Sequence, residues 1–387
     1  MNHQTKFIPS LTPLRGIAAT LVVFFHYHIF IGPLTTPENF MISKLYLMVD
    51  LFFVLSGFIM VHVYGEWFKL KIEKGSFLKF IKARFARLYP LHIITFFYLC
   101  MWIIYMKSQI VFGQTPAIIQ NIFDNTAIFG VLTLTQAWGT HMEATWNTAS
   151  WSISVEFFLY LLFPFIAWVM NRRKHFIKIS LGIGALISLF YLSYVIEPEW
   201  IKEITQQRHF TAEQMRYRPS NTIDVITGFA LLRGLCSFIF GMITYELYKK
   251  GTGKQVLKHG HWFLVIWGGL FLFWFNDLLP DPLAIPIFSF LILQVAYAEG
   301  YLRKVLNGKI FTYLGNISYS IYMIHIPIIL TVFIVSLIKG EMPSSPDKID
   351  FLQNWVGAFI LYVVVIFTAS VTYRFIEKPA RNKLRRI

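Results

Sequence analysis

Residues 45–64 read LYLMVDLFFVLSGFIMVHVY, a run of predominantly apolar residues in which Asp50 is the one acidic side chain. A helix needs about 20 such residues to cross a membrane, because the hydrocarbon layer is roughly 30 Å thick and each residue rises about 1.5 Å. The stretch therefore predicts a membrane-spanning helix.

Nine further stretches of the same kind nearly fill the chain of 387 residues, of which 56% are hydrophobic and only 14% charged. A soluble domain carries roughly 25% charged residues, so a water-soluble fold is excluded. We predict an all-α integral membrane protein, a bundle of about ten transmembrane helices forming a single domain over residues 1–387, with a basic cytoplasmic tail from about residue 377. The predicted spans are 12–31, 45–64, 88–106, 152–170, 177–196, 226–248, 261–277, 281–298, 313–337 and 352–376.

The net charge of +15 follows the predicted topology. With both termini in the cytoplasm, 25 of the 35 Lys and Arg fall in inner segments, eight in outer loops and two, Arg15 and Arg233, within spans. This is the positive-inside bias of membrane proteins. The basic surplus is therefore explained by topology and by contact with anionic lipid heads, and it does not call for nucleic acid.

The two long outer loops, 107–151 and 197–225, are where structure outside the spans is expected. Residues 118–138 are moderately apolar but broken by polar residues, which favours an interfacial or re-entrant segment over an eleventh span. Cys100 and Cys236 both fall in predicted spans, and we interpret them as packing residues rather than as a disulfide or metal site; no metal is expected.

Ionisable side chains within the spans are candidates for function, because each costs roughly 2.5–3.5 kcal/mol to insert. Arg15 and His26 are 11 residues apart, about three helical turns, and so share a face of the first helix. His26, Asp50 and Glu156 are all predicted in the outer part of their spans. A histidine near carboxylates suits a general base or nucleophile, so these three are the predicted catalytic residues.

Arg84 and Arg87 open the third predicted span at its cytoplasmic end. Two guanidinium groups offer planar, permanently charged donors that match phosphate. With Arg15, they are predicted to hold the phosphates of a nucleotide-bearing donor at the inner surface. The alternative is that they are positive-inside anchors whose side chains extend to the lipid heads.

The ninth predicted span carries Ser318, Tyr322 and His325 at i, i+4 and i+7, a polar stripe on one helix face. Ser152, Glu156 and Tyr160 repeat the i+4 spacing on the fourth. Such stripes either line a site or form hydrogen bonds between helices, and both interpretations stay open.

These residues lie in strings that resemble membrane acyltransferase family 3, the group that includes O-antigen, exopolysaccharide and Nod-factor acyltransferases. Each string is weak alone, but their order and spacing along almost the whole chain are specific. The strings are Leu14-Arg-Gly-Ile-Ala-Ala19 with Arg15 eleven residues before His26, Val49-Asp-Leu-Phe-Phe-Val-Leu-Ser-Gly-Phe58, Arg84-Phe-Ala-Arg87, Trp151-Ser-Ile-Ser-Val-Glu156, Arg233 with Phe238 and Gly241, Leu314 to His325, and Glu377-Lys-Pro379.

The resemblance implies ten core helices, a cytoplasmic acyl-coenzyme A donor, acetyl-coenzyme A by default, and an acceptor hydroxyl on a carbohydrate or glycolipid beyond the membrane. It also implies a catalytic role for His26 and a location in the bacterial cytoplasmic membrane. Some family members carry a fused extracytoplasmic hydrolase-like domain. We expect any second activity here to come from another protein.

The hypothesis for the reaction is that the arginines hold the donor while its thioester reaches His26. His26 then either removes the acceptor proton or first takes the acyl group, and the sequence leaves both routes open. Asp50 or Glu156 would orient the imidazole, as the acid of a catalytic triad does. Tyr322, Ser318 or a backbone amide would stabilise the oxyanion.

Further substrate contacts are predicted for His325, Arg233 and Trp151. Trp138, Trp146 and Trp151 either stack on sugar faces or belong to the interfacial aromatic belt. The main rival function is a secondary transporter with an intramembrane charge relay, although no paired half-sequences with broken helices are visible. The other is a non-catalytic membrane scaffold, for which the buried charges would be an unexplained cost.

Overall fold

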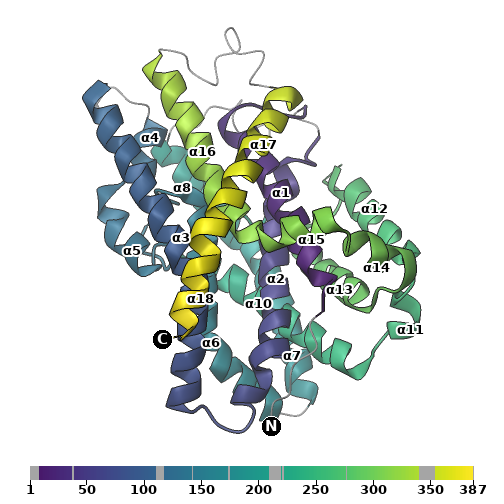
Figure 1. Cartoon of the computed structure of the whole chain (residues 1–387). Helices are drawn as coiled ribbons and strands as arrows, with labels where there is room; N and C mark the ends of the chain where they lie inside the picture. The colour runs from purple at the N-terminus through teal and green to yellow at the C-terminus, as the bar shows by residue number, and fades with distance from the viewer. Residues whose placement is uncertain are drawn as a thin grey trace.

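The computed structural model describes residues 8–36, 39–109, 117–141, 143–172, 175–208, 219, 222–275, 277–339 and 354–386. Across these ranges the chain is helical and contains no strand, which confirms the predicted all-α class. Its α-helices, shown in Figure 1, are α1 Leu11–Phe30, α2 Met48–Tyr64, α3 Lys74–Gln109, α4 Ala117–Ile122, α5 Ile128–Thr133, α6 Trp151–Arg172, α7 His175–Tyr191, α8 Glu197–Arg208, α10 Ala230–Lys250, α11 Lys254–Leu257, α12 His261–Phe275, α13 Ala284–Tyr297, α14 Gly300–Leu306, α15 Lys309–Asn316, α16 Ser318–Ile338, α17 Trp355–Thr372 and α18 Lys378–Arg386.

Each of the ten predicted spans contains a helix, but within the described residues only eight helical segments are long and apolar enough to cross a membrane. A ninth would be formed by Asp281–Tyr297 with Gly300–Leu306, although this pair bends by 99° at its break. The helix of the predicted span 261–277 is the short α12. The difference has a simple origin: hydropathy detects apolar runs, whereas the length of each straight helix depends on where the chain turns.

The third predicted span is part of a much longer helix. α3 has 36 residues and therefore measures about 54 Å, well beyond the hydrocarbon thickness. Its first turns are polar and basic, so the span predicted from hydropathy starts only at residue 88, two residues before Pro90. Helix α18 packs against α3. Arg84 and Arg87 thus lie within a continuous helix rather than at its beginning.

Helices α2 and α10 pack backbone to backbone through glycine. A Cβ atom at Gly241 would lie 1.9 Å from the carbonyl oxygen of Val54, and one at Gly57 would lie 2.1 Å from that of Phe238. Small residues at such crossings allow close approach, the usual means of helix association in membranes. The crossing places Asp50 of α2 beside Arg233 of α10.

Helix α1 meets the short helix α15 in the same way. A Cβ at Gly16 would lie 2.6 Å from the backbone nitrogen of Gly315, and one at Gly315 would lie 2.1 Å from the carbonyl oxygen of Thr12. The predicted span 313–337 is therefore broken before Ser318, and Figure 1 shows α15 lying across the bundle rather than along it.

The outer segment between α5 and α6 folds back into the bundle. Its Gln136 amide nitrogen donates to the Ser150 carbonyl at 3.1 Å, and that of Asn147 donates to the Met323 carbonyl at 2.9 Å. Both side chains are buried. The segment 118–138, predicted as interfacial, contains the short helices α4 and α5 and no spanning helix. Helix α6 consequently begins inside the bundle.

Some of the basic residues used for the topology lie outside the described residues, as does the middle of the predicted loop 197–225; these are Lys6, Arg173, Lys174, Arg216, Arg218 and Lys348. Lys44, which was assigned to an outer loop, is buried instead. Its ammonium lies 2.7 Å from the Asp281 carboxylate and also pairs with Asp277. This basic residue is therefore neutralised within the protein.

Replacing Gly241 by Val should lower the stability of the folded protein by about 3 kcal/mol or more, since the added side chain overlaps the α2 backbone. The measurement is the apparent melting temperature of the purified protein in detergent. Gly184→Ala in α7 is the matched control, because nothing lies within 4 Å of its added Cβ. Equal melting temperatures for the two variants would contradict the close packing of α2 and α10.

Candidate active site

The three arginines that the sequence singled out line one cavity. Arg15 reaches it from α1, and Arg84 and Arg87 reach it from α3. The cavity is partly open, and its volume is about 80 Å³, room for several water-sized groups but not for a whole nucleotide. Further lining residues come from α2, α6 and α16, among them Phe52, Ser56, Ser152, Glu156, Tyr160, Ser318, Tyr319 and Tyr322.

Two of the three guanidinium groups have no direct partner in the described part of the chain. Arg84 donates to the Tyr64 hydroxyl at 2.7 Å and lies 4.9 Å from the centre of that ring. Arg15 and Arg87, both half-buried, make neither a hydrogen bond nor an ion pair there. Glu156 and Glu377 act on both of them electrostatically from farther away. The cavity thus presents two guanidinium groups that no described side chain contacts directly.

Glu156 belongs to this cavity. Its Oε1 accepts hydrogen bonds from Ser56 Oγ at 3.1 Å and from the Tyr160 hydroxyl, while neither contact uses Oε2. A second carboxylate, Glu377, is buried behind the arginines and accepts from Ser320 Oγ at 2.7 Å. Glu156 is therefore held by α2 and by its own helix, and it does not contact His26.

His26 is paired with the other predicted histidine. Its Nδ1 lies 3.1 Å from Nε2 of His325 and 3.0 Å from the carbonyl oxygen of Val22, one turn earlier on α1. The two ring centres are 4.8 Å apart, at an interplanar angle of 54°. His325 is fully buried and His26 half-buried. Residues 299 positions apart in the chain thus form one histidine pair.

The arginine cavity ends next to this pair. Tyr322 lines the cavity, and its ring centre lies 5.6 Å from that of His325 and 5.8 Å from that of Phe52. A single layer of side chains therefore separates the cavity from the histidines. A donor anchored at the arginines would have to displace this layer to place its reactive end beside His26.

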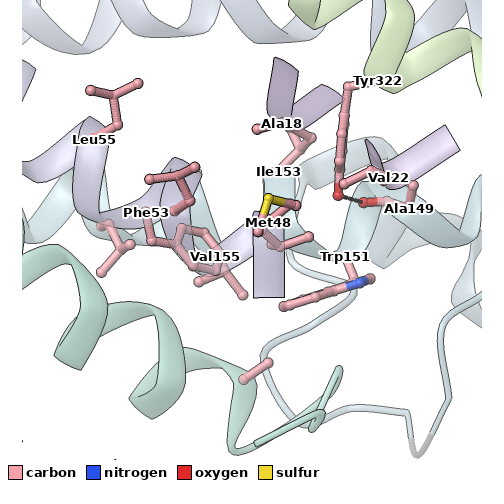
Figure 2. Packing of buried hydrophobic residues seen from close by; sticks show 14 of the residues in the cluster. Ala18, Val22, Met48, Phe53, Leu55, Ala149, Trp151, Ile153, Val155 and Tyr322 are labelled. Atoms are coloured by element: carbon pink, nitrogen blue, oxygen red, sulfur yellow. Dashed lines mark hydrogen bonds between the residues drawn. The ribbon is translucent and has the colours of Figure 1, made fainter. Parts of the chain in front are cut away.

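The predicted oxyanion donors already have acceptors within the protein. The Tyr322 hydroxyl donates to the Ala149 carbonyl at 3.0 Å, as Figure 2 shows, and lies 2.6 Å from Ser152 Oγ. Ser318 donates to the Gly315 carbonyl at 2.9 Å. Here both side chains connect helices or close a turn. Either must exchange its partner before it can stabilise an oxyanion.

Asp50 contacts Arg233 rather than His26. The guanidinium group binds the carboxylate at both oxygens, with Nη2 2.7 Å from Oδ2 and Nε 3.1 Å from Oδ1, and both side chains are fully buried. Ser237 donates to the same carboxylate at 3.1 Å. The Trp151 ring, predicted as a sugar contact, is buried and lies 5.1 Å from the Arg233 guanidinium carbon.

The three predicted catalytic side chains, His26, Asp50 and Glu156, have separate partners and do not contact one another in the described part of the chain. Ser56, which binds Glu156, lies six residues after Asp50 on α2, about 9 Å along the helix axis.

A carboxylate that the sequence did not single out acts electrostatically on His26. It is Asp224, on the segment before α10. Arg233 Nη1 holds it at 3.0 Å, and its side chain is 22% exposed. No motif or periodicity marks this loop residue, so only its place next to Arg233 reveals it.

No cluster of three or more potential metal-ligating side chains occurs among the residues that the structure describes. Cys100 and Cys236 are both free thiols.

Trp146 is buried, and its indole nitrogen donates to the Asp124 carbonyl at 2.9 Å. That of Trp138 donates to the Ser154 carbonyl on α6 at 3.3 Å, so both indoles already have acceptors within the protein.

Fold and site together define a multi-pass helical membrane protein with a cationic cavity that ends beside a histidine pair. Residues 8–374 match the family model described as an acyltransferase domain, and the chain belongs to that family. No solved structure shows a significant match to it.

Curated relatives carry O-acetyltransferase or acyltransferase names. The chain is 24% identical to peptidoglycan O-acetyltransferase OatA of Listeria monocytogenes over 98% of its own length and 57% of that protein. It is 25% identical to acyltransferase MdmB of Streptomyces mycarofaciens, over 98% of its own length and 93% of that protein. O-acetyltransferase OatA of Staphylococcus aureus is 23% identical, again over 98% of this chain but only 58% of the relative. The chain therefore spans little more than half the length of the two OatA proteins.

The Asp50–Arg233 pair should behave as a structural ion pair. Arg233→Met leaves a fully buried carboxylate without its main partner, and Asp50→Leu does the same to the guanidinium, so each should cost about 3–5 kcal/mol. The double variant should recover part of that loss, because neither fully buried charge of the pair is then left without the other, and Asp224, which also loses Arg233, is partly exposed. Melting temperatures in detergent test this expectation, with the exposed Lys82→Gln as control. Additive losses in the double variant would contradict it.

Proposed function

We propose that the protein is a transmembrane O-acyltransferase. It would move an acyl group, acetyl by default, from cytoplasmic acyl-coenzyme A to a hydroxyl of an extracytoplasmic carbohydrate or glycolipid. Family membership supports the reaction class. The location proposed is the bacterial cytoplasmic membrane, with both termini inside and residues 1–387 acting as one domain.

The observation that carries the proposal is the pair of unpartnered guanidinium groups of Arg15 and Arg87. A half-buried cation without a hydrogen-bond acceptor is costly, and an anionic ligand removes that cost. Arg84 adds a third charge at the same cavity. Phosphate or pyrophosphate oxygens match this donor-rich wall, which supports a donor bound through its phosphates.

The cavity is too narrow for a complete coenzyme A molecule. Its 80 Å³ suit a phosphate or the slender arm of the donor, so the nucleotide would remain at the cytoplasmic surface. The arm would then extend past Ser318 and Tyr322 toward the histidine pair. Arg15 and His26 are 11 residues apart on α1, roughly 16 Å, which is the distance this arm has to cover.

His26 is the group proposed to act at the thioester. Val22 and His325 both contact its Nδ1, which leaves Nε2 to face a substrate. As a base, Nε2 takes the acceptor hydroxyl proton while the oxygen attacks the thioester carbonyl; the carbon–sulfur bond breaks, and the thiolate leaves with that proton. As a nucleophile, Nε2 first carries the acyl group. Both routes give an ester and free thiol.

The acceptor class rests on the names of the relatives. The Listeria protein is named for peptidoglycan and the Staphylococcus protein for O-acetyl transfer, and the chain matches only 57% and 58% of their lengths. A carbohydrate hydroxyl is therefore the acceptor proposed here. Asp224, partly exposed and near His26, is a candidate contact for that hydroxyl.

Arg87→Gln should weaken binding of coenzyme A about 10- to 100-fold, because a charge-assisted hydrogen bond contributes about 1.5–3 kcal/mol. The measurement is the dissociation constant of radiolabelled coenzyme A for the protein in lipid vesicles. Lys82→Gln is the matched control, since Lys82 is an exposed cation on the same helix and does not line the cavity. Equal affinities for the two variants would contradict a donor site at these arginines.

His26→Ala should reduce acetyl transfer from labelled acetyl-coenzyme A by about 10²- to 10⁴-fold, with donor affinity unchanged. The assay follows label on the protein and on a glycan extract in vesicles. Label retained on the wild-type protein and lost in the variant would favour the acyl-histidine route. Equal transfer by both proteins would contradict the role of His26, and no turnover by wild type with any acyl donor would favour a transporter.

A further inference from the structure

We infer that His325 is the positioning residue of the reaction and takes the place that a carboxylate has in a catalytic triad. It would accept a hydrogen bond from Nδ1–H of His26 and so keep Nε2 of His26 free for chemistry. The inference rests on the proposed function, but the arrangement of protons on the two histidines can be tested without any turnover.

The pair is built into the centre of the bundle. His325 lies on α16 and is fully buried, and its Nε2 reaches His26 Nδ1 at 3.1 Å across to α1. Aromatic rings surround the two imidazoles: Phe25 lies 5.0 Å and Phe30 6.3 Å from His26, and Tyr322 lies 5.6 Å from His325, all between ring centres. Packing of this kind restricts both rings to one orientation.

The backbone carbonyl of Val22 decides which nitrogen carries the proton. A carbonyl oxygen only accepts, so its 3.0 Å contact with His26 Nδ1 requires a proton on that nitrogen. His325 Nε2 lies 3.1 Å from the same nitrogen and must then be the unprotonated acceptor of a shared hydrogen bond. The opposite assignment would direct the Nδ1 lone pair of His26 at the carbonyl lone pairs.

The assignment extends one step further along α16. With Nε2 as acceptor, neutral His325 carries its proton on Nδ1. That nitrogen is buried and has no hydrogen-bond acceptor among the described residues. The tautomer of His325 therefore follows from its contact with His26 alone.

The arrangement has a use in either chemical route. When His26 Nε2 takes the hydroxyl proton, the ring becomes an imidazolium, and His325 Nε2 stabilises its Nδ1–H. When Nε2 is acylated instead, the Nδ1 proton can pass to His325, leaving a neutral acyl-imidazole, and it returns when the acyl group leaves. The number of protons is conserved in both routes.

No other described side chain takes this place. Asp50 is bound to Arg233, and Glu156 is bound to Ser56 and Tyr160. Asp224 acts on His26 electrostatically, but its carboxylate accepts from Arg233, and its backbone N–H donates to Thr222 Oγ1. His325 is the described side chain that shares a hydrogen bond with the imidazole of His26.

The first experiment compares His325→Phe, which fills the space without an acceptor, with His325→Gln, whose amide oxygen can replace Nε2. We expect His325→Phe to lower kcat about 100-fold or more while KM for acetyl-coenzyme A changes less than about threefold. His325→Gln should restore most of kcat. In a His26→Ala background, His325→Phe should have no further effect, because it acts through His26.

His92→Phe is the matched control, since His92 is also buried and its Nε2 contacts the Val131 carbonyl, at 2.8 Å, rather than either histidine of the pair. It should keep the wild-type kcat. Equal kcat for His325→Phe and wild type, or a further loss in the His26→Ala background, would overturn the inference. A wild type that transfers no acyl group would instead refute the proposed function.

Nitrogen NMR of histidine-labelled protein in lipid vesicles tests the proton arrangement without turnover. Neutral His325 should show an unprotonated Nε2, and neutral His26 a protonated Nδ1. The signals are assigned from their loss in His325→Gln and His26→Ala. A protonated Nε2 on His325 would overturn the inference even if the protein is an active acyltransferase.

Discussion

A charge enclosed by helices in a membrane must have a partner, and the Asp50–Arg233 pair shows how this constraint organises the bundle. Glycine contacts bring α2 and α10 close enough for a bidentate ion pair with no solvent exposure. The third guanidinium nitrogen of Arg233, Nη1, donates to Asp224. The guanidinium group also lies against the rings of Tyr46 and Trp151. One guanidinium group therefore orders four separate segments around the outer half of the site.

The arginines of the cavity differ from Arg233, because two of them have no carboxylate partner among the described residues. Arg15 and Arg87 are half-buried next to Arg84, and no described carboxylate pairs with them directly. Glu156 is held by hydroxyl groups and Glu377 by Ser320, so both remain at a distance. An unpaired cluster of this kind is suited to a ligand that brings its own negative charge.

The segment between α5 and α6 lies beside the arginine cavity. Its Asn147 donates to the Met323 carbonyl of α16, and its Ala149 carbonyl accepts from the Tyr322 hydroxyl at the end of the arginine cavity. The segment is therefore bound to α16 at two points beside the cavity.

The sequence by itself determined the helical membrane class, most of the spans and the three arginines that line one cavity, because hydropathy, charge asymmetry and helical spacing are local properties. It also predicted a catalytic role for His26. It could not determine which charges meet. Asp50 and Arg233, 183 residues apart, pair through a glycine crossing, and His26 and His325, 299 residues apart, meet across α1 and α16. Only the tertiary structure decided these contacts, because they depend on how far each helix extends and on which backbones approach closely.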